Sequence, residues 1–333
     1  MAAQPDRPVT VALPQPPVAK LTGWDAIRRG LANLRANWQL VLMYFAQTVV
    51  VTVVTVAGFL VPLFAVGLER WDDLGDWDPS SGADPWTEVL ALLAELGTPF
   101  VLGLLGAAVV WCLALVLLSW FQGGFYGVLA AGDRQAVPGR VVDWRAFRTF
   151  SLANFSGWGV RFLWRYFWFW NLFGLVVLAW MVLAVGLVFG AIWGAERYGE
   201  AAAVGIGCGG ALPLVFLIFV VSLWAGLAAA HLGQEGSRVG LAARDGMRVL
   251  GARIGAILLI FLLFFVASFA LSAILSVVFL PLTFGSALVF EERFAIYVAV
   301  QAVSYLVQLA LSSVLATALA AVYVALVRSE APR

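Results

Sequence analysis

Six long runs without a charged residue most constrain what this chain can fold into. The runs cover residues 36–68, 96–132, 166–195, 201–234, 254–290 and 294–327. About 20 apolar residues in a helix cross the hydrocarbon core of a bilayer, and every run is longer than that. A water-soluble fold must cover its core with polar groups, yet only 12% of this chain is charged and 63% is hydrophobic. The sequence therefore predicts an all-α integral membrane protein with six transmembrane helices.

Lysines and arginines are distributed unevenly between alternate connecting segments. Seventeen of the twenty lie before residue 36, in 133–165, in 235–253 or after 327, and only three lie in the other connections. Cationic residues concentrate on the cytoplasmic side of membrane proteins. We therefore expect three helical hairpins with both termini in the cytoplasm, in the plasma (inner) membrane of a bacterium.

The chain is expected to form one membrane domain behind a short tail. Residues 1–20 contain five prolines and no apolar segment, which predicts a disordered cytoplasmic tail and not a signal peptide. The membrane domain is predicted to cover 21–329. Its spans are expected near 38–67, 99–130, 166–194, 204–232, 254–280 and 296–327.

Basic amphipathic segments precede the odd-numbered spans. Thr22 and Asp25 have the spacing of a capping box at the start of 21–37, where apolar residues recur at helical spacing. Residues 143–158 place tryptophan and phenylalanine among arginines. We predict that both segments form helices lying along the cytoplasmic surface. Their candidate contacts with anionic lipid headgroups are Arg28, Arg29, Arg35, Arg145 and Arg148.

The three expected hairpins share a layout. Each begins with a basic segment, and each even-numbered span ends in a stretch rich in glycine and alanine, at 127–131, 226–230 and 318–321. The layout is either an internal triplication or convergent patterning.

Polar residues recur at helical spacing on the last two spans. An unpaired polar group in hydrocarbon is costly, so we expect this stripe to face the interior of the bundle. There it would either form hydrogen bonds between helices or line a polar path or pocket, which Gln47 and Asn171 could join. The stripe consists of Ser268, Ser272, Ser276, Gln301, Ser304, Gln308 and Ser312.

Glycines at four-residue spacing favour close helix packing. Gly186, Gly190 and Gly194 fall on one helix face, where another backbone can approach. Within one chain of six helices this favours packing between its own helices. A protein partner or a homo-oligomer through these Gly faces is the alternative.

Residue patterns for catalysis, metal binding and cofactors are not found. The runs contain no Asp, Glu, Lys or Arg, and neither Cys112 nor Cys208 has a C-x-x-C partner or a nearby histidine. The one histidine, His231, is interpreted as an interfacial polar residue, with a pH sensor as the alternative. We expect no enzyme activity, no cofactor, no metal site and no nucleic-acid partner.

The acidic segment 69–95 has oxygen side chains spaced like those of a calcium loop. Ser81 and Thr87, however, stand where an EF-hand needs glycine and glutamate. A solvated loop on the side poor in positive charge is the interpretation that we keep.

The segment Gln122-Gly123-Gly124-Phe125-Tyr126-Gly127-Val128-Leu129 closes the second span before a connection that contains Trp144 and Phe147. Together with the repeated alternation of basic segment and span, it resembles a group of six-helix bacterial membrane proteins. The nearest named family is the membrane domain of glycerophosphoryl diester phosphodiesterases. We expect no catalytic domain after Arg333, so the resemblance implies neither hydrolase activity nor any site residue.

Function is predicted only by class. We expect a structural, scaffolding or accessory membrane protein. The alternative is a transporter, channel or lipid-handling protein with a polar path along the last two spans. A wide polar cavity between the helices would favour transport, and a solidly packed bundle would favour a scaffold.

Overall fold

The computed structural model describes residues 21–66, 85–136, 143–235, 238–288 and 294–330, so the predicted tail at 1–20 lies outside the described residues. Within these ranges the chain is helical and has no strand. The long helices are α2 (Gln39–Val66), α4 (Pro85–Gln135), α5 (Leu152–Tyr198), α6 (Glu200–Glu235), α8 (Ile254–Leu288) and α9 (Phe294–Glu330). The short elements are α1 (Gly23–Ala36), the 3₁₀ turn η2 (Trp144–Phe147) and α7 (Val239–Ala252). In the described residues six helices are long and apolar enough to cross a membrane, which confirms the prediction of an all-α fold with six candidate spans for this part of the chain.

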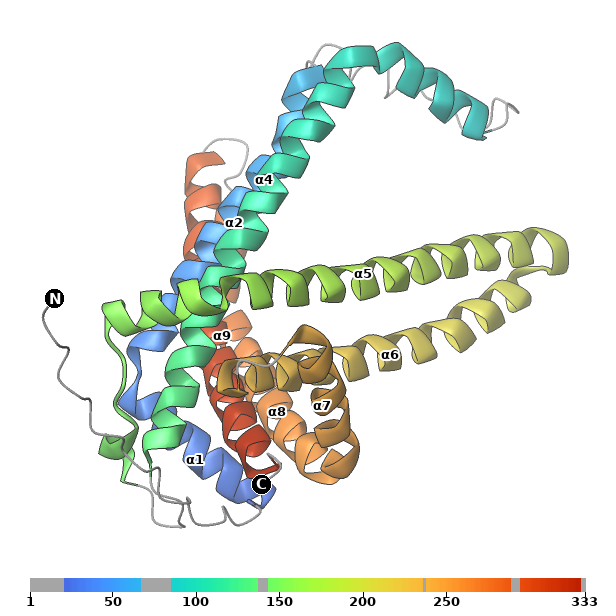
Figure 1. The fold of residues 1–333 in the computed structure, drawn as a ribbon. Coiled ribbons are helices and arrows are strands. Elements are labelled where there is room, and N and C mark those ends of the chain that lie inside the picture. Colours follow the sequence, from blue (N-terminus) through green and yellow to red (C-terminus); the bar gives the residue numbers. More distant parts are fainter. Residues whose placement is uncertain (1–20, 67–84, 137–142, 236–237, 289–293, 331–333) are drawn as a thin grey trace, which may run out of the picture.

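Buried side chains concentrate at one end of the long helices, which we call the packed end. There the last turns of α4, α6 and α9 meet the first turns of α2, α5 and α8, with α1, η2 and α7 packed against them (Figure 1). Tyr166, Phe125, Leu227 and Leu326 are enclosed in this core. The glycine- and alanine-rich ends of the even-numbered spans therefore form the centre of the fold.

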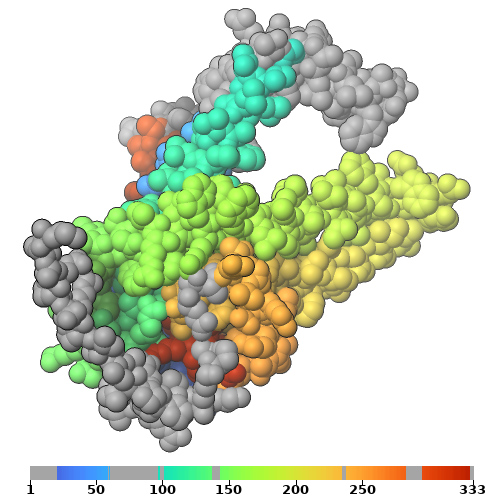
Figure 2. Space-filling model, in the orientation of Figure 1, coloured from blue at the N-terminus to red at the C-terminus, as the bar shows by residue number. Residues whose placement is uncertain are grey.

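Away from the packed end the helices diverge. α5 and α6 run side by side as an arm that extends away from α2 and α4 (Figures 1 and 2). The most apolar stretches of both helices contain no buried residue, and Phe189 and Phe216 are 64% and 67% exposed. A soluble protein rarely leaves such a large apolar surface uncovered. These faces are the surface that a lipid bilayer would cover.

Glycines let the short helices approach the long ones closely. A Cβ atom on Gly30 of α1 would lie 2.6 Å from the backbone nitrogen of Val322 in α9. One on Gly246 of α7 would lie 3.0 Å from the backbone nitrogen of Ala228 in α6. Any larger residue would push these helix pairs apart, so the packed end depends on glycine at both contacts.

The buried faces of α1 and α7 correspond position by position. Each helix has 14 residues, with a buried alanine at its fourth position and a buried glycine at its eighth. The pairs are Ala26 with Ala242 and Gly30 with Gly246. Each helix directly precedes a long one, so the similarity of layout seen in the sequence extends to packing for the first and third units.

The helix predicted over 21–37 is confirmed as α1. Its N-cap is Thr22, whose hydroxyl oxygen accepts a hydrogen bond from the Asp25 backbone N–H at 3.1 Å. The same hydroxyl donates to the Asp25 carboxylate at 2.7 Å. The cap satisfies one of the free N–H groups at the start of the helix, which is why the helix begins here.

The prediction of a second surface helix over 143–158 is wrong. Only the short turn η2 forms there, and α5 then begins after its N-cap Ser151. The side-chain oxygen of Asn37 accepts hydrogen bonds from the backbone N–H groups of Thr149 and Phe150 at 3.0 and 2.9 Å. These bonds hold the chain out of helical conformation, so the amphipathic residues that follow join the long helix α5.

Two glycines with positive φ set the direction of the chain. Gly97 has a φ of 56°, which glycine adopts without strain, and it separates the first three turns of α4 from the remainder. The acidic segment 69–95 is predicted as a loop, but its described part is helical, because α4 begins at Pro85. Gly199, with a φ of 87°, ends α5 and is followed at once by α6.

Candidate functional site

The polar stripe predicted for the last two spans is not an interior feature of this chain. Ser268, Ser272 and Ser276 of α8 are exposed, and so are Gln308 and Ser312 of α9. The prediction is wrong for these five side chains. Helical spacing places them on common faces, but a shared face is buried only where a neighbouring helix covers it.

Divergence of the helices explains why the stripe is uncovered. The fully buried residues of α8 are Ile257 and Ile260, in its first two turns, and the serines lie farther from the packed end. On α9, Ser304 is buried and Gln301 is partly buried. These two are the only stripe residues that this chain itself covers.

Four of the five arginines predicted to contact anionic lipid are exposed. The guanidinium carbon of Arg28 lies 5.5 Å from the centre of the Trp24 ring. Those of Arg35 and Arg145 lie 4.9 and 5.8 Å from one indole, that of Trp144. Arg148 is also exposed. Exposure leaves these four side chains accessible to a headgroup.

Arg29 is the exception, and its assignment as a lipid contact is wrong. Its side chain is 7% exposed, and its Nε lies 2.6 Å from Oδ1 of Asp133, which is 1% exposed. Arg328 Nη1 lies 2.9 Å from the other carboxylate oxygen. One carboxylate at the end of α4 therefore pairs with arginines from the first and last helices and joins the two ends of the chain.

Buried amides extend this connection to η2. Asn33 of α1 donates to the Leu129 carbonyl of α4 at 2.9 Å, and Asn37 donates to the Phe147 carbonyl of η2 at 2.7 Å. Buried polar groups with complete partners specify one arrangement of the helices around them. The polar residues at this end thus have a structural role.

The single histidine is also part of the packing. His231 of α6 is buried, and its Nε2 lies 2.9 Å from Oδ2 of Asp245 in α7. Trp224, two turns before His231 on α6, donates its Nε1–H to the Ala243 carbonyl at 2.8 Å. Both contacts fasten α7 to α6, so His231 is buried between these helices.

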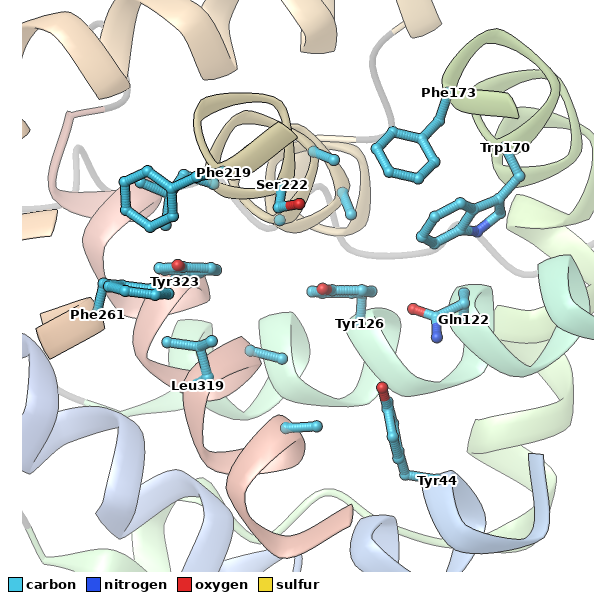
Figure 3. Close-up of a pocket in the computed structure, with 16 residues that line it drawn as sticks. Tyr44, Gln122, Tyr126, Trp170, Phe173, Phe219, Ser222, Phe261, Leu319 and Tyr323 are labelled. Atoms are coloured by element: carbon cyan, nitrogen blue, oxygen red, sulfur yellow. The ribbon is translucent and has the colours of Figure 1, made fainter. Parts of the chain in front are cut away.

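A cavity of about 340 Å³ lies between the six long helices, next to the packed end. We call it the central pocket. Seven of its sixteen lining residues are aromatic, with Trp170 and Phe173 on one side and Phe219 and Phe261 on the other (Figure 3). Its lining consists of Tyr44, Gln122, Tyr126, Trp170, Phe173, Phe219, Ser222, Leu223, Ala225, Gly226, Ala229, Phe261, Ala316, Leu319, Ala320 and Tyr323.

Contacts between rings fix the walls of the central pocket. The rings of Phe219 and Phe261 meet edge to face with centres 4.5 Å apart, and those of Trp170 and Phe173 do so at 5.5 Å. Such pairs add about 0.5–1.5 kcal/mol to the burial of the rings. The pair of Phe219 and Phe261 joins α6 to α8, whereas Trp170 and Phe173 lie one turn apart on α5.

Few polar groups face this apolar space. Gln122 uses its amide nitrogen to donate to Gln47 at 3.0 Å, which leaves its carbonyl oxygen directed elsewhere. Figure 3 shows the Tyr44 hydroxyl directed toward the space between Tyr126 and Gln122. The indole N–H of Trp170 is buried without a hydrogen-bond partner, and it has no surface open to the cavity. The central pocket therefore offers few donors and acceptors on a mainly apolar surface.

Small residues create the space. A Cβ atom on Gly226 of α6 would lie 2.6 Å from the ring of Tyr323, so only glycine lets this ring lie against the helix. Ala225 and Ala229 of α6 and Ala320 of α9 complete the same surface. The glycine- and alanine-rich ends of the spans thus serve both the core and the central pocket.

The sequence analysis did not predict the central pocket, although the positions of the tyrosines indicate where it lies. Four of the seven tyrosines gather there or beside it: Tyr44, Tyr126, Tyr166 and Tyr323. Each lies within an apolar run, not far from its basic end. Tyr166 donates its hydroxyl to the Ala229 carbonyl at 2.7 Å, directly behind the pocket wall. Buried tyrosine needs a polar partner, which distinguishes it from phenylalanine in such a run.

The lining is suited to binding an uncharged group. It contains no Asp, Glu, Lys, Arg, His or Cys side chain that could act as a general base, nucleophile or metal ligand. Across the described part of the chain, no group of three or more His, Cys, Asp or Glu residues is arranged to hold a metal. What this geometry supports is recognition by shape, aromatic contact and a few hydrogen bonds.

Comparison with protein-family models, curated proteins and solved structures finds no match for this chain.

Proposed function

We propose that this chain is a lipid-handling membrane protein that binds one lipid-like molecule in the central pocket. The observation that carries the proposal is that all six long helices contribute to a single aromatic cavity. Pockets for small ligands measure about 300–1,000 Å³ and are mostly apolar with a few placed polar groups. The proposed role is binding, and it requires no catalysis, cofactor or metal.

The depth of the central pocket supports a ligand taken from the bilayer. Tyr126 lies seven residues before Asp133 and Gln122 lies eleven before it, which correspond to about 10 and 16 Å along the helix. Half of a bilayer's hydrocarbon core is about 15 Å thick. An acyl or isoprenoid chain is soluble in the hydrocarbon core at this depth, whereas a free polar solute is not.

Two polar groups of the lining narrow the chemistry further. The Tyr44 hydroxyl could donate to an ester, ketone or hydroxyl oxygen on the ligand, while the Gln122 carbonyl oxygen could accept from a hydroxyl. We therefore propose a ligand whose enclosed part is uncharged and carries at least one oxygen.

This proposal takes up the alternative from the sequence and changes its location. The polar path was expected along the last two spans, where Ser272 and Gln308 are exposed. The central pocket draws on all the long helices and has a mainly apolar lining. A scaffolding role has less support, because a scaffold requires no cavity between its helices.

We propose further that the packed end faces the cytoplasm of a bacterial plasma membrane, with three hairpins and both termini on that side. The uneven distribution of arginines supports this orientation. Reporter fusions at Arg333 and at residue 82 should report inside and outside respectively, and an outside report from Arg333 would overturn it. The resemblance to the membrane domain of glycerophosphoryl diester phosphodiesterases is proposed as a likeness of fold alone.

Filling the central pocket tests the ligand. Ala316→Phe places a ring in the cavity from α9, and Ala310→Phe places the same ring on the exposed face of the same helix. Each variant is purified through repeated detergent washes, and lipids that remain are identified by mass spectrometry. Wild type and Ala310→Phe should retain about one molecule of a defined lipid per chain, and Ala316→Phe should lose it.

Two results would overturn the proposal. One is a wild-type protein that retains no defined lipid, and the other is Ala316→Phe retaining the same lipid as wild type. Thermal unfolding of both variants in detergent identifies a folding defect. If Ala316→Phe does not fold, the smaller change Ala316→Leu is used in its place.

A further inference from the structure

Two arginines from different helices flank one indole at the packed end. The guanidinium carbons of Arg134, in the last turn of α4, and Arg161, in the first half of α5, lie 5.7 and 5.0 Å from the centre of the Trp158 ring. Trp158 in turn stacks on Phe162, with ring centres 5.3 Å apart and planes 19° from parallel. Arg165 lies 5.6 Å from the Phe162 ring. We call these five residues the Trp158 platform.

The Trp158 platform is held in place before any ligand arrives. A Cβ atom on Gly127 of α4 would lie 2.5 Å from the Trp158 side chain, so the indole is pressed against the helix. Arg134 Nη1 donates to the Gln234 carbonyl at the end of α6 at 2.6 Å. A guanidinium whose position is fixed loses less conformational freedom when it binds an anion.

Positive charge on the platform is not neutralised. Among the described side chains, none of Arg134, Arg161 and Arg165 forms an ion pair. The adjacent carboxylate, Asp133, is already shared by two other arginines. Burial and the charges of Arg328 and Arg161 lower the pKa of Arg134, and the opposing effect of Asp133 is smaller. Several guanidinium groups close together that outnumber the carboxylates beside them attract an anion.

Helix length places the platform at the level of lipid headgroups. α5 has 47 residues, which is about 70 Å at 1.5 Å per residue and far more than a 30 Å hydrocarbon core. Its uncharged run begins directly after Arg165. Trp164 and Trp168 on either side of that boundary are 65% and 62% exposed, as expected for tryptophan at a membrane interface.

We infer that the Trp158 platform binds the phosphate of an anionic phospholipid in the leaflet at the packed end. The planar guanidinium forms paired hydrogen bonds with phosphate oxygens, and phosphate is the charged group found at this depth in a membrane. The arginines attract the net negative charge, and the exposed tryptophans contact the adjoining acyl region. This site is separate from the central pocket and does not depend on the ligand proposed there.

Competition between two lipids tests the platform in the full-length chain. Purified protein in neutral detergent is mixed with equal amounts of dioleoylphosphatidylglycerol and dioleoylphosphatidylcholine, and native mass spectrometry gives the ratio of the two bound forms. Wild type should favour phosphatidylglycerol. The double variant Arg134→Gln/Arg161→Gln should lower the ratio by about fivefold for each arginine removed.

Arg197→Gln is the matched control. Arg197 lies over Trp193, 5.6 Å from the ring centre, at the far end of the same helix. The variant Arg197→Gln removes an arginine that lies over a tryptophan, but it does not change the Trp158 platform. It should therefore leave the ratio of bound phosphatidylglycerol to phosphatidylcholine unchanged. The double variant should lower the ratio as much in the Ala316→Phe background, in which the central pocket is filled, and this separates the test from that of the central pocket.

Three outcomes would overturn the inference. They are an unchanged ratio in the double variant, an equal fall in Arg197→Gln, and displacement of phosphatidylglycerol by an equal concentration of soluble glycerol 1-phosphate. If the double variant unfolds, Arg161→Gln alone decides, because its exposed side chain has no ion pair among the described residues. Arg161→Lys, which keeps the charge, should restore part of the preference.

Discussion

Replacing Asp133 with asparagine removes the one negative charge that two arginines share at the packed end. Arg29 and Arg328 lie 2.6 and 2.9 Å from its two carboxylate oxygens. The side chain of Asp133 is 1% exposed, that of Arg29 is 7% exposed and that of Arg328 is 11% exposed. Asparagine has nearly the same shape, so the change tests charge and not packing. It leaves two buried cations without their anion.

The expected loss follows from that burial. Removing one partner of a buried ion pair costs about 3–5 kcal/mol, because the remaining charge has no compensation. Arg29 still donates to the backbone carbonyls of Asp133 and Ala136, at 2.9 and 3.3 Å. These bonds retain part of its solvation. We therefore expect the lower end of the range, about 3 kcal/mol.

Unfolding in mixed micelles measures this loss. The protein in mild detergent is titrated with sodium dodecyl sulfate, and helix content is followed by circular dichroism. The control is Asp143→Asn, because Asp143 is exposed and caps η2 by accepting from the Arg145 backbone N–H at 3.0 Å. Asparagine caps about as well as aspartate, so the control should change the free energy of unfolding by less than about 0.5 kcal/mol.

A loss below about 1 kcal/mol for Asp133→Asn would refute the reasoning, because that is the range of a solvent-exposed pair. A double-mutant cycle with Arg29→Met adds a second criterion. If the ion pair is the cause, Arg29→Met combined with Asp133→Asn should cost less than the two single changes added together. Strict additivity would assign the loss to some other effect of the asparagine.

Two further predictions concern packing and exposure. Gly30→Ala should destabilise the chain by about 1–3 kcal/mol, because the new methyl group overlaps the Val322 backbone. Gly251→Ala has no atom within 4 Å of the new methyl group, so it should stabilise α7 by up to about 1 kcal/mol. The same titration measures both, and equal effects would contradict the close contact of α1 with α9. Gln308→Leu should leave the free energy of unfolding of the single chain within about 0.5 kcal/mol, since the glutamine is exposed; a larger loss would show that something covers it.

The sequence by itself determined the long helices and the first short one. A run of uncharged residues longer than a bilayer has few ways to satisfy its backbone other than as a helix, and this constraint is local. The start of α1 was equally local, because Thr22 and Asp25 lie three residues apart and cap the helix without help from the rest of the chain.

Only the tertiary structure decided where η2 ends and α5 begins. The residues after 143 have an amphipathic pattern that favours a helix, but Asn37, more than a hundred residues earlier in the chain, binds the backbone of Thr149 and Phe150. A hydrogen bond from so distant a residue is invisible to helical periodicity. The same reason explains Arg29, which has the sequence context of a surface arginine and is buried by Asp133 from α4.

The candidate sites depended on tertiary structure most of all. Periodicity placed Ser268 and Gln308 on definite faces of their helices, but it could not say which face a neighbour covers, and divergence of the helices leaves both exposed. The central pocket and the Trp158 platform each join residues from separate helices. Spacing along one helix is a property of the local backbone, whereas a cavity or a cluster of charges exists only once the helices have packed.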